Sequence, residues 1–512
     1  EWLCYINELS RKNVQTPNTV KHKALVFIEL NYRALTNHLL VLSFGGGISY
    51  IEDSLIVKDF GFTVSRKLLE LDKIENINSV LLGNKFLNSR RQSGSFIPAS
   101  RLIEADSYTM VKDVTGKTDR GFWIGGNSPV IFKGKLDLKK DLIPLIDSFM
   151  ANYFSSSPDS LSFDNTLQKV SNTDTITKLN EKLTDKILRV KNTYSLNKAL
   201  NGSDLVNLDF ATEMIKDPDR FIGYYIGGVK YKSSVPELDK EDYFSRLSKH
   251  LITKKITAAN KNLIIEKIKR DRLEAVYEDD EEESLGSVFN NLFFETKFES
   301  QKYVLLSGKW FVIDEEFYKT LRDDMDAIPE YNAELDFFQY DKSVHPREEN
   351  YNKYIAEEND NVDCLDQVFH TLPPHIKKTY DFNAHGKMEP CDLLTSPKRG
   401  TYHFIHVKKG KNASDMSHLF AQGYASAKLL MGDKRLIEHI NNNITSNPKI
   451  DENILPNDIE VVFAMTLPEN QMKLKNSKTF TLLSMLTIVS YIKRLSLLGF
   501  RYSIQKILDV SP

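Results

Sequence analysis

The chain has 512 residues, enough for two to four domains with sizeable apolar cores. Its 41% hydrophobic and 27% charged residues are typical of a globular protein, and a formal net charge of −2 excludes a basic field over the whole surface. Three cysteines (Cys4, Cys364 and Cys391) are too few for a disulfide scaffold, so we expect a reducing, cytoplasmic environment.

The first 155 residues combine short strands, glycine turns and one helix, and predict an α+β domain. They begin with neither a signal peptide nor a start methionine, so we expect the sequence to begin inside a longer protein. Three glycines at 45–47 follow a strand candidate. A phosphate-cradling loop is one interpretation. Because no GxxxxGK[ST] follows and the next residues resemble a strand, we predict a glycine turn between two strands.

A segment rich in Ser, Pro and Asp at 155–164 predicts a linker, and a mainly helical middle region at 156–285 follows it. Residues 254–272 are strongly basic, and six consecutive acids occupy 278–283. One hypothesis is a basic face that binds nucleic acid, beside an acidic segment that mimics nucleic acid. The simpler interpretation is a set of solvated helix faces and loops.

Residues 286–512 return to a β-rich pattern and predict a mixed sheet flanked by helices. Ser307-Gly308 is a turn signal between two strands, and residues 346–358 predict an acidic helix. The longest apolar run, 480–492, is shorter than the ~20 residues of a membrane-spanning helix, so we expect a buried helix and no membrane. The whole chain is therefore predicted to be a multi-domain protein of mixed α and β structure.

The segment 387–431 has the densest set of polar residues, and predicts a strand, a turn, a second strand and a helix. In the second strand, the period of two places His406 and Lys408 on one face and His403 on the other. Asp392 lies within reach of His406 and Lys408 if the hairpin is in register.

Two further residues of this segment are candidates. Glu389 would join the site only if a bulge at Pro390 turned it round. In the following helix, Gln422 lies one turn after His418, beside an apolar stripe.

Two other chemistries fit parts of this segment. His406-x-Lys408 is similar to the H-x-K-x4-D motif of phospholipase-D-like enzymes, but Ala413 stands where the aspartate is required. A zinc site is suggested by seven of the eleven histidines between 370 and 439, with Cys364 and Cys391 nearby, but the spacing lacks CxxC or HxxxH. We expect both cysteines to be small core residues.

Local charge favours a polyanionic partner. Residues 376–411 include eight Lys or Arg and only three acids, in a chain that is otherwise near neutral. A phosphate backbone is a natural partner for such a patch, although an ordinary basic surface is the alternative. The candidate nucleic-acid-binding residues are Lys398, Arg399, Lys409 and Lys411.

The order of an acid, a turn, an x-x-Lys strand and a helix with a glutamine resembles the PD-(D/E)XK nuclease superfamily, with its restriction-endonuclease-like sheet. The resemblance implies metal-assisted phosphodiester hydrolysis with Mg²⁺ or Mn²⁺ as cofactor. Asp392, Lys408 and Gln422 match the catalytic positions, and Asp392 with Glu389 and His406 would bind the metal. His406 departs from the pattern, since Glu or Asp is expected there. Glu389, or a helix acid such as Glu349, would then supply the second carboxylate.

A second resemblance spans almost the whole chain. It rests on SFGGG and DFGF at 43–62, SGKWFVID at 307–314, EPCDLL at 389–394, HFIHVKKG at 403–410 and SHLFAQGYASAKLL at 417–430. In this order they are similar to a prokaryotic family known as the "sporadically distributed" proteins, often found near defence or mobile genes. The resemblance implies a C-terminal nuclease-like region acting against foreign DNA.

We therefore predict three domains, at 1–155, 156–285 and 286–512, with the nuclease-like site in the last. The expected partner is nucleic acid, DNA rather than RNA, and a homo-oligomer is possible. The alternatives are a catalytically inactive module that binds or senses nucleic acid, or an interaction scaffold.

Overall fold

The computed structural model describes most of the chain in separate stretches, which form two compact units. The first unit comprises residues 1–79, 89–103 and 111–163, and the second comprises 80–88, 104–110 and 164–512. The described residues are 23–29, 39–44, 46–51, 55–57, 60–70, 73–81, 85–92, 109–118, 121–126, 129–134, 137–155, 167–170, 172–200, 204–210, 212–213, 220–232, 238–332, 335–365, 390–395, 400–410, 413–445 and 449–511.

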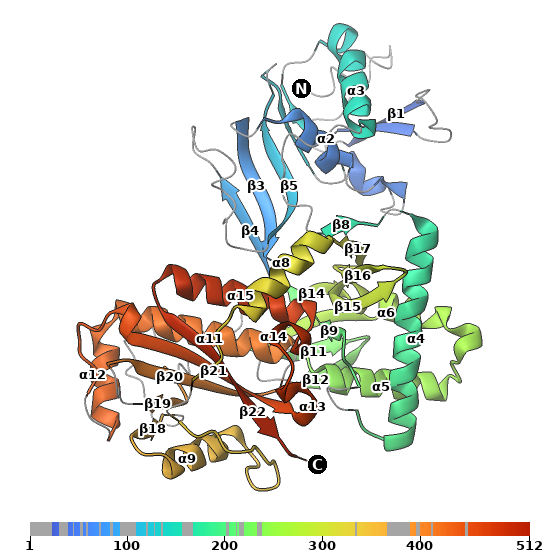
Figure 1. The fold of residues 1–512 in the computed structure, drawn as a ribbon. Helices are drawn as coiled ribbons and strands as arrows, with labels where there is room; N and C mark the ends of the chain where they lie inside the picture. Colours follow the sequence, from blue (N-terminus) through green and yellow to red (C-terminus); the bar gives the residue numbers. More distant parts are fainter. Residues whose placement is uncertain are drawn as a thin grey trace. The chain divides into compact units, whose positions relative to one another are not determined.

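The N-terminal elements form an antiparallel β1–β2 pair and a sheet in the order β4-β3-β5-β6-β7, with two helices (Figure 1). Their apolar core gathers residues from α2, α3 and this sheet, with Val64, Ile77 and Phe149 among them. The elements are β1 (Ala24–Glu29), β2 (Leu39–Phe44), α2 (Phe60–Leu68), β3 (Ile74–Leu81), β4 (Lys85–Gln92), β5 (Thr109–Lys117), β6 (Trp123–Gly125), β7 (Ile131–Lys133) and α3 (Leu138–Phe154).

The prediction of a strand after the three glycines is wrong. A short 3₁₀ helix, η1 (Gly47–Tyr50), follows them, and α2 comes next among the described residues. Gly46 has a φ of 79°, and a Cβ on Gly47 would lie 2.6 Å from the backbone oxygen of Ala24. The glycines therefore allow the chain to turn and to approach β1 closely, because a side chain has no room there.

The middle of the chain contains two sheets in addition to the predicted helices. One has the order β12-β11-β13-β14, and the other has the order β8-β17-β16-β15-β9. The second sheet joins strands from both sides of residue 285, the predicted domain boundary, because β9 pairs with β15. The strands of these two sheets are β8 (Leu167–Lys169), β9 (Leu208–Phe210), β11 (Phe221–Ile226), β12 (Val229–Lys232), β13 (Arg272–Tyr277), β14 (Glu282–Ser287), β15 (Leu292–Phe298), β16 (Gln301–Leu306) and β17 (Lys309–Ile313). The short strand β10 (Thr212–Glu213) belongs to neither sheet.

The helices between residues 173 and 291 share one apolar core with both sheets, whereas Leu321 and Met325 of the next helix belong to the core of the C-terminal sheet. The turn predicted at Ser307-Gly308 is confirmed, and both residues have positive φ, 48° and 70°. A two-residue hairpin loop of type I′ requires this conformation. The helices are α4 (Thr173–Asn197), α5 (Lys240–Thr253), α6 (Asn262–Arg270), α7 (Val288–Asn291) and α8 (Glu315–Asp326).

The last part of the chain folds around a mixed sheet in the order β18-β19-β20-β21-β22. Its first three strands pair antiparallel, and β20, β21 and β22 pair parallel. The elements are α9 (Glu348–Glu358), β18 (Val362–Cys364), β19 (Leu393–Thr395), β20 (Tyr402–Lys409), α11 (Ala413–Gly432), α12 (Lys434–Asn443), β21 (Ile459–Pro468), α13 (Glu469–Met472), α14 (Asn476–Thr479), α15 (Leu482–Leu497) and β22 (Arg501–Asp509).

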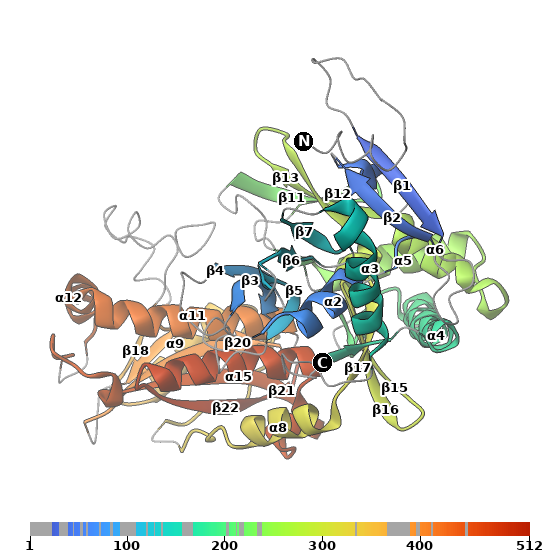
Figure 2. The same cartoon turned by 90° about the horizontal axis from the view of Figure 1, so that it is seen from above.

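The two faces of this sheet carry different cores. Phe404 of β20 packs with residues of α11 and α15 in one core, whereas Ile405 and Val407 pack with residues of α9 in the other. Figures 1 and 2 show α11 and α15 running together along one face. The prediction of a mixed α and β, multi-domain protein with a C-terminal sheet flanked by helices is therefore confirmed. No helix among the described residues is long and apolar enough to cross a membrane.

Candidate active site at the edge of β20

The candidate site begins where β19 stops covering β20. The short β19 pairs with residues 403–405 of β20, with Leu393 opposite Ile405. Just before β19, the Asp392 N–H donates to the Ile405 carbonyl at 2.9 Å. Beyond this point the N–H groups of Val407 and Lys409 need other acceptors, because an unpaired buried N–H is costly.

Two carboxylates supply these acceptors. Asp392 Oδ2 accepts the N–H of Val407 at 2.6 Å, and Glu348 Oε2 accepts the N–H of Lys409 at 2.8 Å. The two bonded N–H groups are two residues apart, or about 7 Å along the strand. The hairpin register therefore brings Asp392 to the strand end that carries Lys408, as the sequence predicted.

Glu348 also pairs with Lys408. Its Oε1 lies 3.3 Å from Lys408 Nζ, and the two side chains are 28% and 29% exposed. One carboxylate thus binds a backbone N–H and a side-chain ammonium of adjacent residues. Asp392, in contrast, is only 5% exposed. The site combines a buried acid with an acid–lysine pair that is partly exposed to solvent.

Glu348 is the residue that sequence reasoning missed by one position. The acidic helix was recognised, but Glu349 was named, and Glu349 is exposed. Helical periodicity contained the signal: Glu348 is three and seven residues before Tyr351 and Ile355, which are both fully buried. Residues at this spacing share one helix face, so Glu348 was the acid to expect against the sheet.

His406 occupies the position where the nuclease pattern has its second acid. Its side chain is 0% exposed, and its ring lies 6.2 Å from the ring of Phe463 in a stacked arrangement. Neither ring nitrogen has a hydrogen-bond partner among the described residues. Burial, together with the nearby His418, lowers the pKa of His406 to about 3, so the imidazole is neutral. This position favours a core role over a metal-binding role.

The face predicted for each residue of the second strand agrees with this packing. Phe404 belongs to the core on the side of α11, where His406 stacks on Phe463. His403 faces the other way, and its Nδ1 lies 2.7 Å from the hydroxyl of Tyr331, which belongs to the opposite core. Gln422 is half-buried on α11, the helix that packs against β20.

The remaining predicted site residues divide into two groups. Lys409 is described: its Nζ lies 4.9 Å from the centre of the Tyr340 ring, which is a cation–π contact at the end of β20. Glu389, Lys398, Arg399 and Lys411 lie outside the described residues. Their roles stay predictions.

The zinc alternative gains no support from the cysteines. Cys391 is fully buried in the core on the side of α11, and Cys364 packs against the core on the side of α9. Cys391 is therefore a core residue, as predicted. Within the described part of the chain, no group of three or more His, Cys, Asp or Glu side chains is placed to hold a metal ion.

The donor chemistry of the site nevertheless fits a hard divalent cation. Mg²⁺ is usually held by one or two carboxylates, and takes its other ligands from water and substrate phosphates. Asp392 and Glu348 offer such oxygens at one strand end, beside Lys408. The two carboxylates therefore suit Mg²⁺ or Mn²⁺, whereas the imidazole of His406 is buried in the core; its predicted role as a metal ligand stays a prediction.

Comparison with known proteins identifies the chain only at the level of a family. It belongs to a family of unknown function, DUF6119, whose model matches residues 1–508. No curated protein and no solved structure matches the chain. The family membership covers nearly the whole sequence but carries no activity.

Proposed function

We propose that the C-terminal part of the second unit is a nuclease-like domain that binds and hydrolyses the phosphodiester backbone of foreign nucleic acid, DNA in preference to RNA. The observation that carries this proposal is the meeting of Asp392, Glu348 and Lys408 at one end of β20. Two carboxylates and a lysine at a strand end are the groups that metal-assisted phosphodiester hydrolysis requires.

The order of elements supports the same function. The chain runs α9, β18, β19, β20, α11 and β21, with an antiparallel meander followed by a parallel strand. This is the succession expected of a restriction-endonuclease-like core. A fold alone does not define an activity, so the argument depends on the residues at the edge of β20.

The residues of this site have distinct roles in the proposed reaction. Asp392 and Glu348 would hold Mg²⁺ or Mn²⁺, which, when bound, supplies an activated water and neutralises charge on the phosphate. Lys408 binds the substrate phosphate, and must then exchange its ion pair with Glu348 for one with the phosphate. Substrate binding would thereby free a Glu348 oxygen to bind the metal ion. Gln422 supports the site from α11.

A second candidate function is a module that binds nucleic acid without cutting it. The specific observation in its favour is His406, because a buried neutral imidazole replaces the second acid of the strand. In this case Lys408 and Lys409 would still bind phosphates, and binding would weaken steeply with salt without depending on a divalent metal.

The test is a cleavage assay with Mg²⁺ or Mn²⁺ on plasmid, linear and single-stranded DNA and on RNA. The variants are Lys408→Ala and Asp392→Asn, and the control is Lys428→Ala, which removes an exposed lysine from α11. We expect metal-dependent cleavage by the wild type and the control, and its loss in both site variants. No cleavage of any substrate, or cleavage unchanged by Lys408→Ala, contradicts the catalytic proposal.

A binding titration separates the two candidates. Salt-dependent DNA binding that Lys408→Ala weakens, in a protein that cuts nothing, supports the binding module. No DNA binding at low salt counts against both. The proposed role in defence is tested by challenging a prokaryotic host with phage: the wild type should protect and Lys408→Ala should not.

A further inference from the structure

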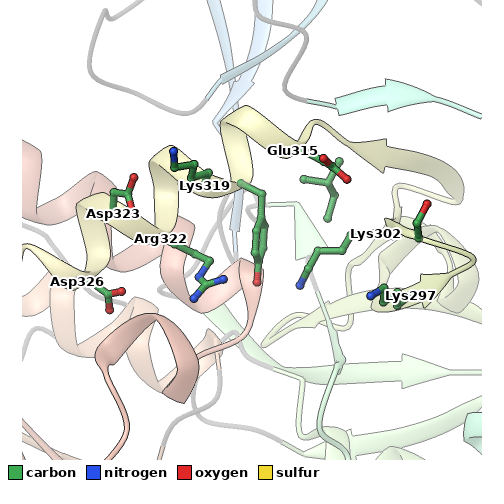
Figure 3. A pocket seen from close by; sticks show the side chains of 10 residues that line it. Lys297, Lys302, Glu315, Lys319, Arg322, Asp323 and Asp326 are labelled. Atoms are coloured by element: carbon green, nitrogen blue, oxygen red, sulfur yellow. The ribbon is translucent and has the colours of Figure 1, made fainter.

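A second polar site lies within the same unit, between α8 and the hairpin of β15 and β16. A cavity of about 410 Å³ opens there, and its lining includes Lys297, Lys302, Lys319, Arg322 and Tyr318 (Figure 3). Cavities that bind small molecules start at about 300 Å³, so this one is large enough. None of these residues belongs to the site at β20.

Three of the cations approach one another. Lys297 and Lys302 are directly opposite in the antiparallel β15–β16 pair, which places their Cβ atoms about 5 Å apart. In Figure 3 Lys302 extends toward α8, and Arg322 extends from α8 into the space between the helix and the hairpin. Lys319 projects away from the two lysines, so it is not part of this group.

Two of these cations lack a protein counter-charge. Within the described part of the chain, neither Lys297 nor Arg322 has an ion-pair partner. Lys302, in contrast, has two partners for its charge: its Nζ lies 3.6 Å from Glu295 and 3.9 Å from the centre of the Tyr318 ring. Like charges placed directly opposite each other on a sheet repel, and Lys297 is exposed to solvent, so an anion that binds beside both lysines would relieve this repulsion.

The acidic residues of the cavity do not cancel this charge. Asp326 accepts the N–H and the hydroxyl of Ser477, at 3.0 and 2.8 Å, and thus belongs to the packing of α14. Figure 3 shows Asp323 and Asp326 on the far side of Arg322 from the lysines. Glu315, at the start of α8, is exposed.

We propose that this cavity binds a small ligand through a di- or triphosphate group, as a nucleoside polyphosphate would offer. The two lysines are point charges for phosphate oxygens, and the guanidinium of Arg322 provides a fork that matches a phosphate. A polyphosphate carries enough negative charge to offset three converging cations. The cavity's volume of about 410 Å³ suits such a compact ligand better than the backbone of a long strand.

The test is isothermal titration calorimetry of the full chain with inorganic pyrophosphate and ATP. We expect both to bind, and Arg322→Gln and Lys297→Gln each to weaken the binding roughly tenfold or more. The matched control is Lys182→Ala, which removes an exposed lysine from α4. Melting temperatures of all variants verify that they remain folded.

The outcomes separate this proposal from the nuclease. No binding of pyrophosphate or ATP, or equal binding by Arg322→Gln and the wild type, overturns it. Binding of a single-stranded oligonucleotide that Arg322→Gln weakens, without pyrophosphate or ATP binding, also overturns it and assigns the cavity to a strand. Because Lys408 is not part of the cavity, loss of DNA cleavage in Lys408→Ala leaves this result unaffected.

Discussion

The edge of β20 and the cavity beside α8 both gather charged side chains, but they differ in how those charges are paired. At β20 each carboxylate accepts a backbone N–H, and Glu348 also binds Lys408. Beside α8, Lys297 and Arg322 have no ion-pair partner in the described part of the chain. The first arrangement is held by the fold itself, whereas the second is complete only with an anion.

This difference predicts how substitutions separate stability from function. A residue that is bonded to the backbone at β20 contributes to both, so its removal costs stability as well as activity. A cation beside α8 contributes to ligand binding and opposes folding slightly. Substitutions of Asp392 and Lys297 test this contrast directly.

The largest effect is expected on the stability of the folded protein at low pH, and it arises from His406. Its pKa is about 3 in the folded protein and about 6.5 in an unfolded chain. Between these values the unfolded state binds a proton that the folded state does not, so stability falls as the pH drops through this window, by up to about 1.4 kcal/mol per pH unit. The loss begins below about pH 6.5 and is complete near pH 3.

His406→Leu removes this proton uptake and should flatten the acid dependence of the melting temperature between neutral and mildly acidic pH. The control is His250→Gln: burial also lowers the pKa of His250, but its side chain is partly exposed. A wild-type slope that persists in His406→Leu shows that other groups cause the acid sensitivity.

The second largest loss of stability is expected for substitutions of Asp392. Asp392→Ala leaves the N–H of Val407 without its acceptor in a buried position, which costs about 1–3 kcal/mol. Asp392→Asn keeps an oxygen that can accept this bond, so it should lose activity with a smaller loss of stability. Denaturant unfolding of both variants measures the difference. Equal losses would contradict the role of the carboxylate as a backbone acceptor.

The smallest effect is expected at Lys297. Lys297→Gln removes one of two opposed cations from β15 and β16, and should raise the ligand-free stability by about 0.5 kcal/mol. Its melting temperature should be equal to or above that of the wild type. A clear decrease would show that Lys297 stabilises the hairpin, and would remove the argument that it awaits an anion.

The sequence predicted much of this arrangement because it depends on local patterns. The period of two in β20 and the hairpin register placed Asp392 near Lys408. The helix after β20 was recognised from its apolar stripe, and Met416, Leu419 and Phe420 are indeed fully buried.

Other features depended on contacts that no local pattern encodes. Glu348 reaches β20 from about sixty residues earlier in the chain. Helical periodicity selects it over Glu349, but no local pattern shows that α9 packs beside the end of β20. At the glycines, the close approach of Gly47 to the backbone of Ala24 is a contact between segments more than twenty residues apart. The cavity beside α8 combines side chains of the β15–β16 hairpin with side chains of a helix, and no single segment of the sequence brings them together.

In the proposed nuclease site, the second metal ligand is the carboxylate of Glu348 rather than the imidazole of His406. The most direct measurement compares metal-dependent DNA cleavage by Glu348→Gln and His406→Leu at neutral pH, where both should be folded. We predict that Glu348→Gln lowers the cleavage rate at least about 100-fold, and that His406→Leu stays within a few-fold of the wild type. Unchanged cleavage in Glu348→Gln, with its loss in folded His406→Leu, would contradict the claim.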